Sequence, residues 1–525
     1  MATPSQKGTT LSTIPWWRDA VCYEIYVRSF ADSNGDGVGD LTGVASRVPY
    51  LAKLGVEAIW LTPFYTSPQA DHGYDVADHR AVDPRFGGLD DFDVMLSTVH
   101  AHGLKLIIDI VPNHTSDAHP WFQAALAAGP GSAERARYWF RPGRGRTGGN
   151  PPNNWKSLFG GPAWTREPDG EWYLHLFDQR QPDLNWRCRE VGDEFESILR
   201  FWLDRGVDGV RVDVANALWK PGDLPDATRQ RPTPYLDMPE VHEVYRRWHA
   251  TMRDYPGDRM GVAEAWVDTP EAMARYIRTD ELQQAFNFHW LLAPWSAASF
   301  RRVLTKTFAA VEPVKASPTW VLSNHDVERH VSRYGGGSRG LARARAATLT
   351  MLALPGSAYL YAGEELGLPQ VDVPAAARQD PAWLRGKGIG RDGCRVPLPW
   401  SGRAQPYGFS PPGAAAPWLP QPDSWTTLSV AAQEADPNST LHFYRRAIAA
   451  RCDLAPTLQR EVSLLPTSPG VLAFARRPGL VCVLNCGSRR ARLPEVGELL
   501  ISSGDTSTVL GGMIDPDTAA WFFRR

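Results

Sequence analysis

The sequence predicts an α/β protein built on a (β/α)8 TIM barrel, with a small domain inserted after strand 3 and a C-terminal antiparallel β domain. Eight short apolar runs alternate with helical patterns from residue 20 onward, which is typical of parallel βαβ units. One long, irregular segment interrupts this alternation, and a stretch of alternating strands follows it at the C-terminal end. The candidate strands are residues 20–27, 56–63, 104–111, 209–214, 261–266, 285–290, 319–324 and 358–363.

Helical patterns separate these strands. Residues 193–206 carry apolar side chains at a spacing of three and four and end in Gly206, a common helix terminator. Residues 340–354 form a second run of this kind. Both favour helices that cover the outside of a barrel.

The two interruptions set the domain boundaries. About 80 residues rich in Gly, Pro, Asn and Trp follow the third strand, too many for a structureless loop. After about residue 455 the helical period gives way to short alternating runs such as VLAFARR and LVCVLNC. The predicted domains are 1–114 (barrel, first part), 115–190 (inserted domain B), 191–455 (barrel, second part) and 456–525 (C-terminal β domain).

Composition narrows the class of protein. The chain of 525 residues has 56 basic and 58 acidic residues, so its charge predicts neither a nucleic acid nor a membrane partner. No signal peptide is expected, and no apolar stretch is long enough for a membrane span. The six cysteines show neither a disulfide framework nor paired zinc-site spacing. We therefore expect a cytoplasmic protein, whose oligomeric state the sequence does not indicate.

Three acidic residues follow predicted strands four, five and seven: Asp213, Glu264 and Asp326. Active sites of such barrels lie where the strands end, so these carboxyl groups are expected to converge over one pocket. Arg211 precedes Asp213 by two residues and shares its side of the strand. Other polar residues at strand ends are Tyr74, Asp75, Asp109, Asn113, His114, Asn324 and His325.

Two carboxyl groups, one ionised and one protonated, are the arrangement that glycoside hydrolysis needs. Arg211 is predicted to lower the pKa of Asp213 by charge pairing, whereas Glu264 would keep its proton beside other carboxylates. Asp326 would stabilise an oxocarbenium-like transition state. On the first strand, Glu24 and Arg28 are expected to form an ion pair inside the barrel.

The segments DIVPNH, GVRVD, AEAW and SNHD resemble, in this order, the four conserved regions of the α-amylase superfamily, glycoside hydrolase family 13. QPDLNW resembles a signature of its oligo-1,6-glucosidase and α-glucosidase branch, and the likeness spans about residues 15 to 455. The resemblance implies a retaining mechanism through a covalent glucosyl-enzyme. It makes Asp213 the nucleophile, Glu264 the general acid/base and Asp326 the transition-state stabiliser. The substrate-binding residues it implies are Tyr74, Asp75, His114, Arg211, His325 and Arg395.

Asp75 and Arg395 match the residues with which exo-acting relatives hold the terminal glucose, which implies a blind pocket. Val214 resembles members that prefer α-1,6 linkages, but the following Ala215-Asn216 departs from them, so α-1,4 and α-1,6 both stay open. The expected substrates are maltose, isomaltose or sucrose-like α-glucosides. A transglucosylase or a sucrose isomerase is the alternative; a non-enzymatic scaffold would need a broken triad and a membrane span, and the sequence has neither.

The loop DSNGDGVGDLTG (32–43) begins like an EF-hand, but Gly43 stands where that motif has glutamate. The family resemblance implies a structural calcium site here, with magnesium as an option and no organic cofactor. Its expected ligands are Asp32, Asn34, Asp36, the backbone carbonyl of Val38, and Asp40. Residues 388–393 match GxGxxG but follow no strand, so they do not predict nucleotide binding.

Overall fold

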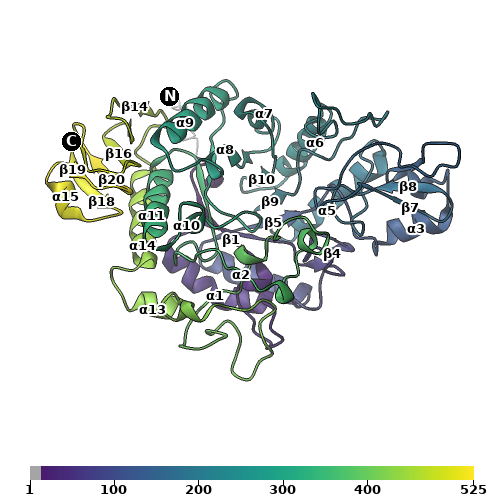
Figure 1. Cartoon of the computed structure of the whole chain (residues 1–525), viewed down its shortest axis with the longest axis horizontal. Helices are drawn as coiled ribbons and strands as arrows, with labels where there is room; N and C mark the ends of the chain where they lie inside the picture. Colours follow the sequence, from purple (N-terminus) through teal and green to yellow (C-terminus); the bar gives the residue numbers. More distant parts are fainter. Residues whose placement is uncertain (1–13, 525) are drawn as a thin grey trace, which may run out of the picture.

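The computed structural model describes residues 14–524 and confirms the predicted barrel (Figure 1). Its eight parallel strands are β1 (Val21–Ile25), β2 (Ala58–Leu61), β5 (Lys105–Ile110), β9 (Gly209–Val212), β10 (Met260–Ala263), β11 (Gln284–Ala285), β12 (Thr319–Val321) and β13 (Ser357–Tyr361). They pair in the order β11-β10-β9-β5-β2-β1-β13-β12. A parallel bridge between Phe286 and Thr319 joins the two end strands and closes the ring.

Large side chains fill the inside of this barrel. Trp60, Phe286 and Tyr359 are almost fully buried, and the ring centroids of Phe286 lie 5.5 Å from Trp60 and 4.9 Å from Tyr359. The barrel is therefore a packed core and not a pore, which leaves chemistry to its rim.

Helices cover the outside of the barrel. The longer ones are α1 (Leu41–Leu54), α2 (Leu89–Ala101), α5 (Arg189–Asp204), α6 (Val241–Arg253), α9 (Ala297–Val311), α11 (Gly337–Ala353) and α14 (Thr440–Leu454). The shorter ones are α7 (Pro270–Arg275), α8 (Phe288–Leu291), α10 (His330–Arg333), α12 (Pro381–Leu384) and α13 (Val430–Glu434). Helix α5 ends just before Gly206, whose φ of 101° suits glycine and turns the chain toward β9.

The segment between β5 and α5 folds as a small unit to one side of the barrel (Figure 1). It contains α3 (Pro120–Ala128), α4 (Ala133–Ala136) and a sheet of β6 (Phe140–Pro142), β8 (Glu171–Leu174) and β7 (Trp164–Arg166). The buried Lys220 amine contacts Asp183 at 2.6 Å and Asn113 at 2.7 Å, which ties this unit to the end of β5. β3 (Tyr65–Thr66) and β4 (Asp78–Val82) pair nearby.

The C-terminal part forms an antiparallel sheet against α11, drawn in yellow in Figure 1. Its strands are β14 (Ser463–Leu464), β15 (Val471–Arg476), β16 (Leu480–Asn485), β20 (Thr518–Phe523) and β18 (Glu498–Ser502), with α15 (Thr506–Leu510) and the pair β17 (Ala491–Arg492) and β19 (Met513–Ile514) beside it. The Trp521 indole donates to the carbonyl of Leu349 on α11 at 2.9 Å. All six cysteines are free, and no helix within residues 14–524 has the length and apolar character needed to span a membrane.

Candidate active site

A cavity of about 280 Å³ lies at the carboxyl ends of the barrel strands. It is bordered by strand-end loops, by the inserted segment and by the segment after β13. Its polar lining residues are Asp71, Tyr74, His114, Asp213, Asn216, Glu264, Asp326 and Arg391. Its apolar lining residues are Leu158, Phe159, Phe177, Val214, Leu236 and Trp266.

One side of the cavity is organised by Arg211 and three carboxylates, Asp109, Asp213 and Glu264, which we call the Arg211 cluster. The buried guanidinium contacts Asp213 at 2.5 Å, Glu264 at 2.7 Å and Asp109 at 2.9 Å. Strands β5, β9 and β10 are neighbours, and Asp109 is directly opposite Arg211 in their register. Pairing of these three strands is thus what brings the four side chains together.

A turn directly after β9 orients Glu264. Val214 adopts a left-handed φ of 46°, and its N–H donates to Glu264 Oε2 at 2.9 Å. The Trp266 indole donates to Oε1 at 3.0 Å. With Arg211, three donors fix the orientation of this carboxylate.

The protonation of the Arg211 cluster differs from the sequence prediction. Burial raises the pKa of Asp213, and the charges of Glu264 and Asp109 add to this although Arg211 opposes it. Burial also raises the pKa of Asp109, to about 7. Arg211 does lower the pKa of Asp213, as predicted, but the net shift is upward because burial outweighs this charge pairing and two further carboxylates lie beside the same guanidinium. The cluster is built to retain a proton near neutral pH.

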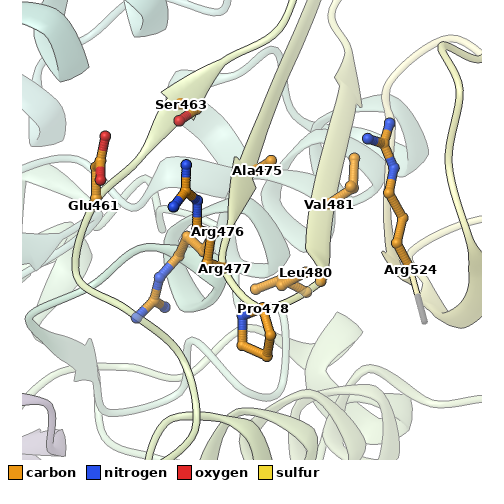
Figure 2. A pocket seen from close by; sticks show the side chains of 10 residues that line it. Glu461, Ser463, Ala475, Arg476, Arg477, Pro478, Leu480, Val481 and Arg524 are labelled. Carbon is orange, nitrogen blue, oxygen red and sulfur yellow. The ribbon is translucent and has the colours of Figure 1, made fainter.

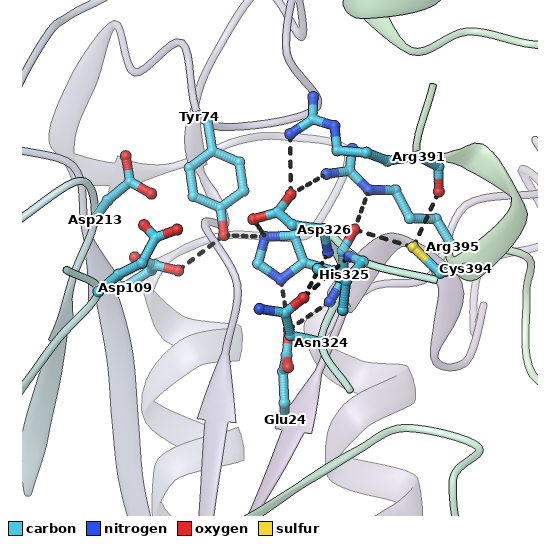
Figure 3. A network of polar contacts seen from close by, with 12 residues as sticks. Glu24, Tyr74, Asp109, Asp213, Asn324, His325, Asp326, Arg391, Cys394 and Arg395 are labelled. Atoms are coloured by element: carbon cyan, nitrogen blue, oxygen red, sulfur yellow. Dashed lines mark hydrogen bonds and ion pairs between the residues drawn. The ribbon is translucent and has the colours of Figure 1, made fainter. Parts of the chain in front are cut away.

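On the opposite side of the cavity a single carboxylate, that of Asp326, is contacted by two guanidiniums. There Asp326 lies beside His325, Arg391 and Arg395, which we call the Asp326 cluster (Figure 3). Asp326 Oδ1 accepts from Arg395 at 2.9 Å and from Arg391 at 3.0 Å. Burial alone would raise the pKa of Asp326, but His325 and the two guanidiniums hold it well below its usual value. This carboxylate stays ionised.

His325 is held on both of its ring nitrogens. Nδ1 lies 2.5 Å from Glu24 Oε1, and Nε2 lies 2.8 Å from the Tyr74 hydroxyl (Figure 3). Glu24 therefore pairs with His325, and the predicted ion pair with Arg28 is wrong. Arg28 instead donates to the Gln69 side chain at 2.6 Å.

Tyr74 and His114 line the cavity, as expected for contacts with a substrate. The Tyr74 hydroxyl donates to Asp109 at 3.0 Å and so connects the two clusters. His114 Nε2 lies 3.1 Å from both the Tyr74 carbonyl and the Gln181 amide. Burial lowers the pKa of His114 to about 4, so its imidazole is neutral.

The structure separates the two residues that were predicted to hold a terminal glucose. Asp75 is fully buried outside the cavity lining, and its oxygens accept from the N–H groups of Ala70 at 2.7 Å and Asp71 at 2.9 Å. Arg395 is also fully buried, where it donates to the His325 carbonyl at 2.8 Å and to Asp326. Neither borders the cavity: Asp75 holds the loop before it in place, and Arg395 acts on the site through its contact with Asp326.

Two other residues, an aspartate and an arginine, lie in the cavity wall where Asp75 and Arg395 were expected. Asp71 and Arg391 line the cavity and form an ion pair at 2.7 Å, which closes its wall beside Asp326. Sequence reasoning missed both. Asp71 and Asp75 stand at the two ends of the same segment DHGYD, and the sequence prediction names the wrong one of these two acids. Arg391 lies inside the GxGxxG match at 388–393, and that match carries no signal for contact with a sugar.

In the predicted calcium loop the side-chain oxygens accept hydrogen bonds from backbone N–H groups of the same loop. Asp32 accepts from the N–H groups of Gly35 and Gly37, Asp36 from Val38, and Asn34 from Asp36. Asp40 caps helix α1 by accepting from Gly43 at 2.6 Å. In the described part of the chain no three acidic, histidine or cysteine side chains converge as a metal cluster. The oxygen donors suit calcium chemically, but as folded they fit a metal only in part.

A parallel barrel whose rim carries two arginine-ordered groups of carboxylates, with a neutral histidine beside them, has the architecture of a glycoside-cleaving enzyme. The family model described as "Alpha amylase, catalytic domain" matches residues 24–460, and the chain belongs to this family. It is a glycoside hydrolase of the branch that includes α-glucosidases and oligo-1,6-glucosidases, as the sequence motifs predicted.

Curated relatives support this branch. The chain is 37% identical to a probable α-glucosidase of Rhizobium meliloti over 91% of this chain and 90% of that protein. It is 35% identical to an oligo-1,6-glucosidase of Parageobacillus thermoglucosidasius, covering 93% and 95%. It is 38% identical to a trehalose-6-phosphate hydrolase of Escherichia coli, covering 88% of each.

Solved structures agree on the fold. An α-glucosyl transfer enzyme superposes with a TM-score of 0.87 at 37% identity, covering 97% of this chain and all of that one. A trehalulose synthase of Pseudomonas mesoacidophila MX-45 gives a TM-score of 0.89 at 30% identity, covering 97% and 99%.

Proposed function

We propose that this glycoside hydrolase is an exo-acting α-glucosidase that removes terminal, non-reducing α-linked glucose from short oligosaccharides. The observation that carries the proposal is the position of the Asp71–Arg391 ion pair beside Asp326, in the wall of the cavity that Asp213 and Glu264 also line. A charged pair in this place can accept and donate hydrogen bonds to the hydroxyl groups of one end sugar. It also blocks passage of a longer chain.

In the proposed reaction the ionised carboxylate of Asp213 attacks the anomeric carbon, while Glu264 carries the proton that the Arg211 cluster retains and gives it to the departing oxygen. The product of this step is a covalent glucosyl ester of Asp213. Glu264 then takes a proton from water, which cleaves the ester and regenerates Asp213. Because two displacements occur, the glucose is released with its original α configuration. Asp326, kept ionised by its cationic neighbours, stabilises the positive charge that develops on the sugar ring.

The retaining, exo-acting reaction has a direct test. Proton NMR of early hydrolysis of a maltooligosaccharide should show α-glucose first, accompanied only by a chain shortened by one unit. Early β-glucose would contradict retention, and larger internal fragments would contradict exo-action. Parallel rates on maltose, isomaltose and sucrose would decide the linkage that the sequence leaves open.

Transglucosylation is the second candidate, and the position of Trp266 favours it. This side chain lines the cavity, is 37% exposed and stacks on Phe288 with ring centroids 3.8 Å apart. A firmly held, exposed indole offers a face on which an acceptor sugar can stack. Product analysis at high maltose concentration tests this, since trisaccharides form only if a sugar competes with water. Isomeric disaccharides made from sucrose would instead indicate an isomerase.

We further propose that the loop of residues 32–40 binds one structural Ca²⁺, using the ligands predicted from the sequence. Hydrogen bonds within the loop already fix its conformation, so a bound ion would only stabilise that conformation further. No step of the reaction depends on it.

A further inference from the structure

A second cavity, of about 500 Å³, lies behind the loop that carries Asp71. Ala70 and His72 line this second cavity, whereas Asp71 between them lines the active-site cavity. Four arginines also border it: Arg28, Arg85, Arg180 and Arg378. We call it the arginine cavity. Its lining residues are entirely different from those of the active site.

The positive charge of the arginine cavity is only partly neutralised. Arg180 pairs with Asp178 at 2.9 Å, and Arg378 pairs with Asp372 at 3.1 Å. Across residues 14–524, no carboxylate lies within ion-pair distance of Arg28 or Arg85. Two guanidinium charges are therefore left without an acidic partner.

Of these two arginines, Arg28 gives the stronger evidence for an anion site, because it is buried. It is only 8% exposed, it lies 4.5 Å from the centroid of the Trp418 ring, and its Nε has no hydrogen-bond partner. Burial lowers the pKa of Arg28, and the charge of Arg85 lowers it further. A buried cation without a carboxylate is costly, and an anion would offset that cost.

The neighbouring acids are already used elsewhere. Asp75 accepts from the N–H groups of Ala70 and Asp71. Asp83 accepts from the N–H groups of Ser67 and Arg85 and from the Gln69 side chain. Burial also lowers the pKa of His72 well below its usual value, so its imidazole is neutral and can donate one N–H. The charged and imidazole groups that line the cavity are therefore hydrogen-bond donors, which suits a ligand that accepts hydrogen bonds.

A smaller cavity in the C-terminal domain provides an internal comparison (Figure 2). It has a volume of about 190 Å³ and is lined by Arg476, Arg477 and Arg524, together with Glu461. Arg476 donates to the carbonyls of Gln459 and Ala353, and Arg524 donates to the carbonyl of Glu495. Each of those two guanidiniums donates to a backbone oxygen, although the Nε of Arg524, like that of Arg28, has no partner; the difference is that a carboxylate, Glu461, also lines this cavity.

We propose that the arginine cavity binds a phosphate group, through Arg28 and Arg85, either as inorganic phosphate or as the phosphoryl group of a sugar phosphate. Two unpaired guanidiniums match the charge of a phosphate dianion, and their planar donors match its oxygens. The proposal is independent of the exo-α-glucosidase assignment, because it concerns a separate cavity.

The test is calorimetric titration of the full-length chain with inorganic phosphate, with sodium chloride keeping the ionic strength constant. We expect one saturable site per chain. Arg85→Gln should weaken it about tenfold or more, since a lost charge-assisted hydrogen bond changes affinity by at least that factor. Arg477→Gln, an exposed arginine of the smaller cavity, is the matched control and should bind as the parent does.

Arg28→Gln should weaken binding further; because Arg28 is buried and that variant can fail to fold, the exposed Arg85→Gln decides the test in that case. Thermal melting identifies the folded variants. Absence of saturable binding at millimolar phosphate, or equal affinity in the parent and Arg85→Gln, would overturn the proposal. Loss of binding in Arg477→Gln alone would overturn it too, since the site would then belong to the other cavity.

Glucose 6-phosphate distinguishes the two sources of the group. Affinity at least about tenfold above that of inorganic phosphate, and sensitive to Arg85→Gln, supports a sugar-borne phosphoryl group. Equal affinity with the same sensitivity supports free phosphate. If glucose 6-phosphate binds to the Arg85→Gln variant with the same affinity as to the parent, the proposal is overturned for the sugar phosphate. Unphosphorylated glucose is the control for binding at the active site.

Discussion

The two sides of the active-site cavity differ in how many cations surround each carboxylate. In the Arg211 cluster one guanidinium serves three carboxylates, and the pKa of Asp109 and Asp213 is raised. On the other side Asp326 accepts from two guanidiniums and lies beside His325, and its pKa is lowered. All three carboxyl groups are buried, which raises the pKa of each, so the number of cations around a carboxylate accounts for the difference between the two sides. A glycosidase needs both conditions a few ångströms apart.

The largest expected effect comes from replacing Asp213, the proposed nucleophile, in the Arg211 cluster. Asp213→Asn should lower kcat/KM on an aryl α-glucoside by about 10⁴-fold or more, because an amide cannot form the glucosyl ester. Circular dichroism and thermal melting would establish that the variant is folded. A folded variant with near-normal activity would remove Asp213 from the proposed role.

The second largest loss of activity is expected when an arginine of the Asp326 cluster is replaced. Arg391→Ala should lower kcat/KM by about 10²- to 10³-fold, because Asp326 and Asp71 both lose a partner and the developing positive charge is held less well. Steady-state kinetics on maltose would measure this. Arg385→Ala, a neighbour that lies outside the cavity lining, is the control and should have a much smaller effect.

The two clusters should also give opposite pH dependence of stability. Asp109 has a folded pKa of about 7, against 3.8 for an ordinary aspartate, so the folded chain binds an extra proton between these values. Its contribution to the free energy of unfolding should therefore fall by up to ~4 kcal/mol as pH rises from about 4 to about 7. Asp326, with its lowered pKa, should instead contribute above about pH 4 and lose that contribution in acid.

Urea unfolding of Asp109→Asn and of the parent across this pH range would separate the two terms. The variant should show a shallower decline between about pH 4 and 7, since Asp213 and Asp71 also have a raised pKa and keep part of it, and it should keep the loss of stability in acid. A parent whose stability rises steadily across that range, or a variant with the same slope, would contradict the assignment.

A smaller effect separates Asp71 from Asp75. Asp71→Asn should raise KM for maltose with little change in stability, because Asp71 borders the cavity. Asp75→Asn should lower the free energy of unfolding by ~1–3 kcal/mol, since its buried oxygens accept two backbone N–H groups. The reverse pattern in kinetics and urea unfolding would restore the residue assignment made from the sequence.

The smallest effect is expected from calcium. Adding calcium after treatment with a chelator should raise Tm by only a few degrees, because the loop is ordered by its own hydrogen bonds. kcat on maltose should not change. Magnesium in a parallel melt tests selectivity, and an identical Tm with and without either ion would contradict a metal site.

Most of the barrel was predictable because its strands are mainly apolar runs, and the residues after them, such as Asp213 and Glu264, are fixed to the rim by that geometry. The predicted strand 285–290 is the exception, since only Gln284–Ala285 pair as β11 and helix α8 begins at Phe288. The positions of side chains in the long connections between strands were not predictable from the sequence. Asp71 and Arg391 meet across 320 residues, and only the folded loops decide that these two, and not Asp75 and Arg395, border the cavity. The protonation of Asp213 also depends on how many acids share Arg211, which one strand cannot reveal.

The pairing of β1 with β13 has a consequence for synthesis of the chain. Val21 of the first strand lies opposite Ala358 of the last, so one side of β1 lacks its partner until more than 300 residues have followed it from the ribosome. An unpaired strand edge invites association with other chains. Arg391 lies later still, so a nascent enzyme cannot cleave a glucoside until most of its length exists. Rapid translation, or a chaperone that shelters the open half-barrel, should therefore favour its yield.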